Sequence, residues 1–213
     1  MSSFIREARN PQCHSKILGE DVAFSGGEPT LYEGLADLCG RIWSESDLGI
    51  SITTHGHHLN EELISALSGT VSIIRFSIDA PEPLYSKIRS RSPSRLQDNT
   101  NKTHDHIPVG INTVVNKDTL PLLDDLAAIV ANLGAINWLL VPETVGGQFS
   151  MDNAQWTRLD EWIALNYQQI PLRVATGATR FLSGPFAFVE SPTIMHMYER
   201  MRLCLAVHIV AMA

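Results

Sequence analysis

Short apolar segments with strand character alternate with amphipathic helical patterns along most of this chain. The strand-like segments cover residues 22–24, 49–54, 71–78, 109–115 and 136–141. The repeat occurs at least five times, at roughly 25 to 35 residues per unit, which is typical of a parallel sheet connected by right-handed crossover helices. The spacing therefore predicts an α/β fold.

Small and polar residues collect where these strands end. The strand-end sequences are Ser25-Gly26-Gly27-Glu28, Thr54-His55-Gly56, Ser77-Ile78-Asp79, Val114-Val115-Asn116 and Val141-Pro142-Glu143. The carboxyl ends of parallel strands share one edge, and ligands bind at that edge in barrels and open α/β sheets. The sequence has no glycine-rich dinucleotide fingerprint and no Walker loop, which weighs against dehydrogenases and nucleotide hydrolases.

The first strand-end sequence predicts a tight turn followed by a helix start. Adjacent glycines, here Gly26 and Gly27, adopt dihedrals closed to other residues and let a ligand lie against bare backbone. Pro29 fixes its own φ and holds the Glu28 region stiff and extended. Such a turn offers backbone carbonyls and one carboxylate to an ammonium group. An ordinary strand-to-helix turn is the alternative interpretation.

Two further strand ends have alternative interpretations. Ser77 and Asp79 could hydrogen-bond a ribose diol, or they could cap the helix expected over residues 82–88. His55, His57 and His58 suggest a metal-dependent enzyme, but no nearby carboxylate or cysteine completes a ligand set. We rank this metal-dependent hypothesis last among the possible functions and predict no metal site.

Composition narrows the class of protein. The chain has 213 residues, 44% of them hydrophobic and 18% charged, which indicates a globular domain with a full core. The net charge of −7 makes a nonspecific nucleic-acid surface unexpected, and the basic cluster of Lys87, Arg89, Arg91 and Arg95 is interpreted as a solvated helix end or loop. With no signal peptide and no long apolar span, the prediction is a cytoplasmic protein without a membrane partner.

The remaining segments predict the domain organisation. Residues 1–19 are expected to be a remnant leader, residues 20–150 the β/α core, and residues 151–213 helices with an extra strand and a truncated end. Residues 90–106 are polar and predict a loop or a loosely attached helix. A last helix is expected over 191–202, and the apolar residues 203–213 are expected to form a core element.

The motifs together resemble the radical S-adenosylmethionine superfamily. Phe24-Ser25-Gly26-Gly27-Glu28-Pro29-Thr30-Leu31 resembles its glycine-glycine-glutamate-proline motif. Thr54-His55-Gly56 resembles its third-strand segment, where asparagine is usual in place of His55. Ser77-Ile78-Asp79 resembles the fourth-strand segment of the subgroup that often carries a SPASM or twitch extension. The resemblance covers about residues 20 to 145.

The resemblance implies a partial (β/α)6 TIM-like barrel that binds S-adenosylmethionine. Gly26, Gly27, Glu28 and Pro29 would hold the methionine ammonium, and Ser77 and Asp79 would lie near the ribose. The region of Val141 would approach the adenine. Thr54 and Asn112 complete the cofactor-contacting positions that it implies.

One departure from the family pattern is large. The family holds a [4Fe–4S] cluster with a CxxxCxxC loop after its first strand, but the cysteines here stand at positions 13, 39 and 204 and form no such triplet. The family's first strand and cluster loop are therefore expected to be missing. The chain would be either a fragment of an enzyme that makes a 5′-deoxyadenosyl radical, with a peptide as substrate, or a cluster-free domain that binds a ligand or partner. A barrel without its first strand would expose a sheet edge and favour self-association.

Overall fold

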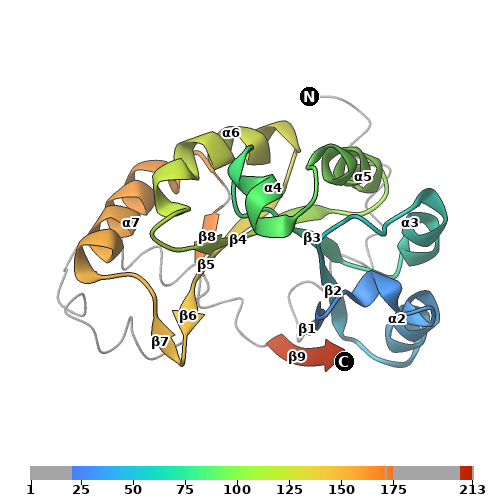
Figure 1. Cartoon of the computed structure of the whole chain (residues 1–213). Coiled ribbons are helices and arrows are strands. Elements are labelled where there is room, and N and C mark those ends of the chain that lie inside the picture. The colour runs from blue at the N-terminus through green and yellow to red at the C-terminus, as the bar shows by residue number, and fades with distance from the viewer. Residues whose placement is uncertain (1–20, 171, 175–206, 213) are drawn as a thin grey trace.

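The computed structural model describes residues 21–170, 172–174 and 207–212 (Figure 1). The predicted leader at 1–19, the helix at 191–202, Cys13 and Cys204 lie outside the described residues. A seven-stranded sheet has the order β8-β5-β4-β3-β2-β1-β9, and its paired strands are parallel. These strands are β1 (Asp21–Gly26), β2 (Gly49–Thr54), β3 (Ile73–Ser77), β4 (Val109–Val115), β5 (Asn137–Pro142), β8 (Leu172–Val174) and β9 (Val207–Met212).

The helices follow the strands in chain order and form an outer arc on one side of the curved sheet (Figure 1). They are η2 (Pro29–Leu31), α2 (Leu35–Glu45), α3 (Glu61–Leu67), α4 (Leu84–Arg89), α5 (Ser94–His104), η3 (Leu120–Leu122), α6 (Leu123–Asn132) and α7 (Asn153–Asn166). A hairpin of β6 (Thr144–Val145) and β7 (Gln148–Phe149) follows β5. The predicted α/β class with parallel strands is confirmed, and the arrangement is that of a partial TIM-like barrel.

Burial alternates along the strands, as the pleat requires. In β3, Ile74 and Phe76 are fully buried against the helices, whereas Arg75 and Ser77 are half-buried on the opposite, concave face. The same alternation in β4 buries Ile111 and leaves Asn112 half-buried. The apolar core therefore lies between sheet and helices, and polar side chains of the central strands face the concave side.

The strand β9 changes the expected edge of the sheet. It pairs with β1 along the whole strand, from Asp21 opposite Val207 to Gly26 opposite Met212. The prediction of an exposed edge on β1 is therefore wrong, because a segment from the end of the chain supplies the neighbouring strand. Self-association stays a prediction, without the physical reason first given for it. The boundary at residue 150 also stays a prediction, although β8 and β9 both belong to the main sheet.

Residues 90–106 are more ordered than their polar composition indicates. They contain α5, a regular helix that buries Leu96, Asn99, Thr100 and Thr103. The Asn99 amide donates to the Gly56 carbonyl at 2.7 Å, and each threonine hydroxyl donates to a carbonyl one turn earlier in the helix at 2.7 Å. Polar side chains can be buried when their hydrogen bonds are made in this way. The expectation of a loop or a loosely attached helix is corrected accordingly.

Asp160 of α7 provides a stability prediction. Burial raises the pKa of its carboxyl from 3.8 to about 6, so the folded state pays for ionisation near neutral pH. Asp160→Asn is expected to raise the free energy of unfolding by about 1 kcal/mol at neutral pH. The gain should fade as the pH falls through 6 towards 3.8, because the folded wild type then takes up its proton. Urea denaturation at several pH values measures this, and a gain that does not depend on pH would contradict it.

Candidate functional site

The turn after β1 exposes backbone next to an anchored carboxylate. Gly26 ends the strand with a φ of 109°, which strongly favours glycine, and both Gly26 and Gly27 are exposed. Glu28 then caps η2, accepting a hydrogen bond from the Thr30 amide at 3.1 Å, and Pro29 begins that helix as a buried residue. The turn can therefore present bare carbonyls to a ligand while its next residues are fixed.

The Glu28 carboxylate joins this turn to the end of β2. Oε1 accepts from the hydroxyls of Thr30 and Thr54, the latter at 2.6 Å. Oε2 accepts from the His55 amide at 2.9 Å and lies 3.2 Å from His55 Nε2. Only 8% of the Glu28 side chain is exposed. The sequence prediction placed Glu28 and Thr54 in one site but did not include these contacts between them, and it missed the pairing with His55.

These contacts set the protonation of both partners. Burial alone would raise the pKa of Glu28, but hydrogen bonds from Thr30, Thr54 and the His55 amide outweigh it and lower that pKa. Burial lowers the pKa of His55, and the Glu28 charge only partly opposes this effect. His55 Nδ1 accepts from the His57 amide at 3.1 Å, which assigns the proton of a neutral imidazole to Nε2, facing Glu28.

The lowered pKa values predict a loss of stability in acid. For His55 the unfolded chain binds a proton more readily than the folded one, so its contribution is complete above pH 6.5 and declines below it. The Glu28 contribution is complete above pH 4.5 and is lost as the pH falls through its folded pKa. Denaturation midpoints should therefore fall in two stages on acidification. We expect His55→Gln to remove much of the first stage, and an unchanged pH profile in that variant would contradict the assignment.

A second group of candidate residues lies on the concave face of β3, β4 and β5. Ser77 ends β3 and is the register partner of Asn112 in β4, while Val141 of β5 is the partner of Val114. Asn112 Nδ2 lies 3.5 Å from the Thr53 hydroxyl, and its buried Oδ1 accepts no hydrogen bond within the part of the chain that the structure describes. A buried acceptor without a donor is rare, and a bound ligand with a hydroxyl or amino group would satisfy it.

Asp79 is engaged by the protein itself. Its buried carboxylate accepts from the Val114 amide at 2.9 Å and pairs with the Arg89 guanidinium. Helix α4 has Pro83 at its N-cap without a side-chain hydrogen bond, so the capping role considered for Asp79 is wrong. The interpretation of Arg89 as a solvated residue is also wrong, because it ends α4 in a partly buried ion pair. This pair holds Asp79 at the strand-end edge, beside β4.

The donor set of the described residues does not fit a [4Fe–4S] cluster. In the described residues the free cysteine is Cys39, which is fully buried in α2, and burial raises the pKa of its thiol to about 12. Such a thiol is not a cluster ligand in its present position. No three His, Cys, Asp or Glu side chains among the described residues are arranged to hold a metal ion. The histidine run therefore gains no support as a metal centre.

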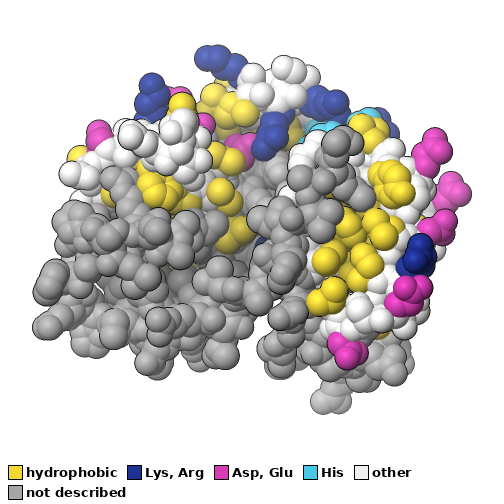
Figure 2. Space-filling view, turned by 90° about the horizontal axis from the view of Figure 1, so that it is seen from below, with side chains coloured by type: hydrophobic (Ala, Val, Ile, Leu, Met, Phe, Trp, Pro, Cys, Tyr) yellow, Lys and Arg dark blue, Asp and Glu magenta, His cyan; other side chains and the backbone are white. Residues whose placement is uncertain are grey.

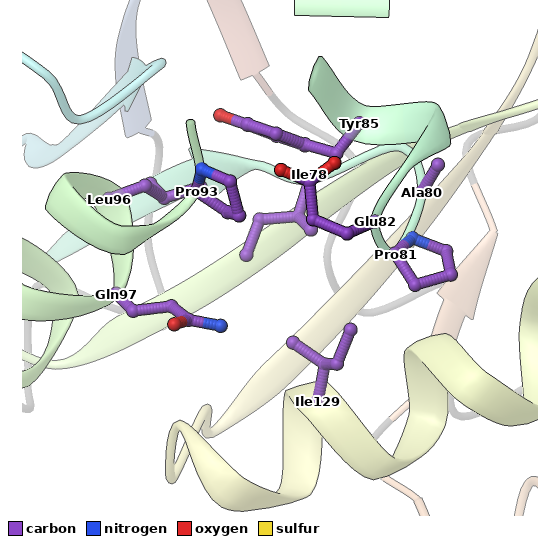
Figure 3. A pocket seen from close by; sticks show the side chains of 9 residues that line it. All are labelled: Ile78, Ala80, Pro81, Glu82, Tyr85, Pro93, Leu96, Gln97 and Ile129. Atoms are coloured by element: carbon purple, nitrogen blue, oxygen red, sulfur yellow. The ribbon is translucent and has the colours of Figure 1, made fainter. Parts of the chain in front are cut away.

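An apolar cavity of about 150 Å³ lies on the other side of the sheet (Figure 3). Residues of α4, α5 and α6 contribute to it, including Tyr85, Leu96 and Ile129, and Ile78 lies among them (Figure 3). Ile78 belongs to the buried, helix-facing set, so the cavity is separate from the concave face. Cofactor pockets usually measure about 300 to 1,000 Å³, so this cavity does not suit a nucleoside cofactor.

Comparison with known proteins identifies the family. The model of the Radical SAM superfamily matches residues 3–129, so the chain belongs to that superfamily. Streptococcus suis SuiB has a similar structure, with a TM-score of 0.63 and 19% identity over 91% of this chain and 50% of SuiB. A domain of the pyruvate-formate lyase-activating enzyme from Bacteroides vulgatus ATCC 8482 gives a TM-score of 0.58 and 16% identity over 74% of this chain and all of that domain.

Some of the similar structures contain ligands. SuiB has been solved with S-adenosylmethionine and with its precursor peptide SuiA, and anSMEcpe has been solved with AdoMet and a Kp18Cys peptide. The match to the latter covers 78% of this chain and 55% of anSMEcpe, with 19% identity and a TM-score of 0.55. The chain thus spans about half the length of SuiB and anSMEcpe. At these identities the structures show the shared fold.

No described helix has the length and apolar character that crossing a bilayer requires.

Proposed function

We propose that this chain is the S-adenosylmethionine-binding part of a radical S-adenosylmethionine enzyme of the SPASM or twitch type that acts on a peptide. The carbonyls of Gly26 and Gly27 receive the methionine ammonium, and Glu28 with Thr54 fixes the turn that presents them. Ser77 and Asp79 lie on the ribose side, and Asn112 and Val141 lie on the adenine side. The proposal includes a cytoplasmic location.

The observation that carries this proposal is the unsatisfied Asn112 Oδ1. It is buried on the concave face, next to Ser77 in the register, and needs a donor that the described protein groups do not supply. A ribose hydroxyl or the adenine amino group has the required chemistry. The exposed residues Gly26 and Gly27 lie at the same strand-end edge, where backbone carbonyls would suit a cation. The neutral part of one ligand could therefore bind at β4 while its cationic part binds at the turn after β1.

The Glu28 carboxylate has a supporting role in this proposal. A carboxylate has about four lone-pair sites, and protein donors already occupy them. Glu28 is therefore a positioning residue here, and its negative charge attracts the ammonium at longer range. The family's cluster chemistry, which supplies the electron for cleavage of the cofactor, is not assigned to any residue described here.

A second candidate function is a cluster-free domain that binds a ligand or a partner chain. The absence of a CxxxCxxC triplet from the sequence and the buried state of Cys39 favour it. Anaerobic reconstitution with iron and sulfide, followed by assay for 5′-deoxyadenosine, tests the cluster-free function. We expect no cluster and no product from this chain alone. Cluster formation with product would show that ligands outside the described residues complete the centre, and would exclude the cluster-free function.

Binding itself is tested by calorimetric titration without iron. S-adenosylmethionine should bind saturably at one site per chain. 5′-Methylthioadenosine, which lacks the ammonium, should bind about tenfold or more weakly if the turn after β1 receives that group. Equal affinities for the two compounds would contradict the role of the turn, and no binding of either would contradict the proposed function.

A further inference from the structure

Three exposed basic side chains lie near the strand-end edge. We call Arg91, Arg95 and His58 the cationic rim. All three are exposed, and within the described part of the chain neither arginine forms an ion pair with an acidic side chain. The chain as a whole carries a net charge of −7, so this local positive charge is opposite in sign to the net charge of the chain.

Packing fixes the rim beside the proposed cofactor site. Helix α5 rests on the loop after β2, because Asn99 donates to the Gly56 carbonyl at 2.7 Å and Leu96 lies directly against Gly56. Arg95 immediately precedes Leu96. Arg91 lies in the linker between α4 and α5, and the Ser86 hydroxyl donates to its carbonyl at 3.1 Å. The linker is thus held close to residues 55–58, which we call the histidine loop.

The loop itself is tied to the cofactor turn. The rings of His55 and His58 are 5.1 Å apart, and His55 contacts Glu28. His57 Nε2 lies 3.3 Å from the hydroxyl of Tyr85 in α4. Burial, followed by the charges of neighbouring cationic groups including Arg91 and Arg95, lowers the pKa of His57. Figure 2 shows Lys and Arg side chains beside His side chains along the upper margin of that view.

We propose that the cationic rim binds an acidic segment of the peptide substrate and so selects peptides with Asp or Glu near the reacting residue. This inference rests on the proposed function and adds the substrate's charge to it. Unpaired arginines recognise carboxylates by paired hydrogen bonds, and desolvation at the edge of a site strengthens them.

A short peptide fits better than a nucleic acid. The first turns of α2 and α3, which lie close to the turn after β1 and to the histidine loop, carry the exposed acidic residues Asp37 and Glu62. A long polyanion crossing the rim would meet these carboxylates, whereas a segment of a few residues would not. Nonspecific nucleic-acid binding also depends on many phosphate contacts, which two arginines cannot supply.

The test uses a fluorescein-labelled oligoglutamate peptide and its oligoglutamine counterpart, titrated with the full chain at low ionic strength. Fluorescence polarisation should show binding of oligoglutamate that weakens as salt is added. Arg91→Glu/Arg95→Glu should reduce that affinity about tenfold or more, since two attractive contacts become repulsive. Arg158→Glu makes the same kind of charge change on exposed α7 and should reduce it much less per substitution. Circular dichroism confirms that each variant is folded.

Three results would overturn the inference: equal binding of both peptides, no loss of affinity in the double variant, or tighter binding of a short single-stranded oligodeoxynucleotide than of oligoglutamate. The last result would assign the rim to nucleic acid. Failure of the acidic-peptide inference can be distinguished from failure of the proposed function. A chain that binds S-adenosylmethionine but not oligoglutamate refutes the acidic-peptide inference alone, whereas one that binds oligoglutamate but not S-adenosylmethionine refutes the cofactor assignment and leaves the rim as a peptide site.

Discussion

Gly56→Ala is expected to lower the free energy of unfolding by about 3 kcal/mol. Gly56 has a φ of 76°, where an L side chain is strained, and a Cβ there would lie 2.7 Å from both Phe76 and Leu96. Its amide and carbonyl are also bound, by Thr54 and Asn99. The costs of backbone strain and of overpacking therefore add at Gly56. The overpacking can be relieved only if the histidine loop moves away from α5.

Gly69→Ala is the matched control. Gly69 has a similar φ of 82°, but a Cβ there would meet no heavy atom within 4 Å. That variant should lose only the backbone part, about 1 kcal/mol. Chemical denaturation of both variants separates the two contributions. Equal losses of unfolding free energy in the two variants would show that Gly56 is not tightly packed against Phe76 and Leu96.

Glu28→Ala has the second large expected effect, on both stability and binding. It leaves the Thr54 hydroxyl and the His55 amide without their acceptor, and hydrogen bonds to a charged group contribute about 1.5 to 3 kcal/mol each. We expect a loss of about 3 kcal/mol in the free energy of unfolding. S-adenosylmethionine affinity should fall about tenfold or more, because the glycine turn loses its connection to β2 and the site loses a negative charge.

Two further variants serve as controls for the effect of Glu28→Ala. Glu33→Ala removes an exposed carboxylate a few residues away and should change neither quantity by more than about 0.5 kcal/mol. Glu28→Gln keeps the shape but places an amide donor among the donors of Thr30, Thr54 and His55, so it should resemble Glu28→Ala more than the wild type. A fully stable Glu28→Gln protein would mean that these hydrogen bonds contribute little.

Much of the architecture could be predicted from local sequence. The strands from β1 to β5 and most helices between them follow from apolar periodicity and from turn and capping residues such as Gly26 and Asn60, whose side chain caps α3. Two features depended on distant partners and could not be predicted in this way. The polar helix α5 is ordered by the bond from Asn99 to Gly56, and β1 is paired by β9 from the far end of the chain.

The strand-end location of the candidate residues could be predicted from the sequence, but the contacts between their side chains could not. Parallel topology brings Glu28, Thr54, Ser77 and Asn112 to the strand-end region, as the motifs indicated. Sequence could not show that the carboxylates of Glu28 and Asp79 are engaged by His55 and Arg89. These pairings depend on side-chain direction across neighbouring strands and helices. Arg89 follows Asp79 by 10 residues, and His55 follows Glu28 by 27, so sequence proximity does not signal either pair.

Binding of S-adenosylmethionine to the concave face is the central claim, and Asn112→Leu tests it most directly. Among the described residues, Asn112 Oδ1 is buried without a partner and Nδ2 has only a 3.5 Å contact, so an apolar side chain of similar size should keep or raise stability. Calorimetric titration of wild type and Asn112→Leu should then show one site per chain in the wild type and about tenfold or more weaker binding in the stable variant. Unchanged affinity in that variant, or no binding by the wild type, would contradict the account.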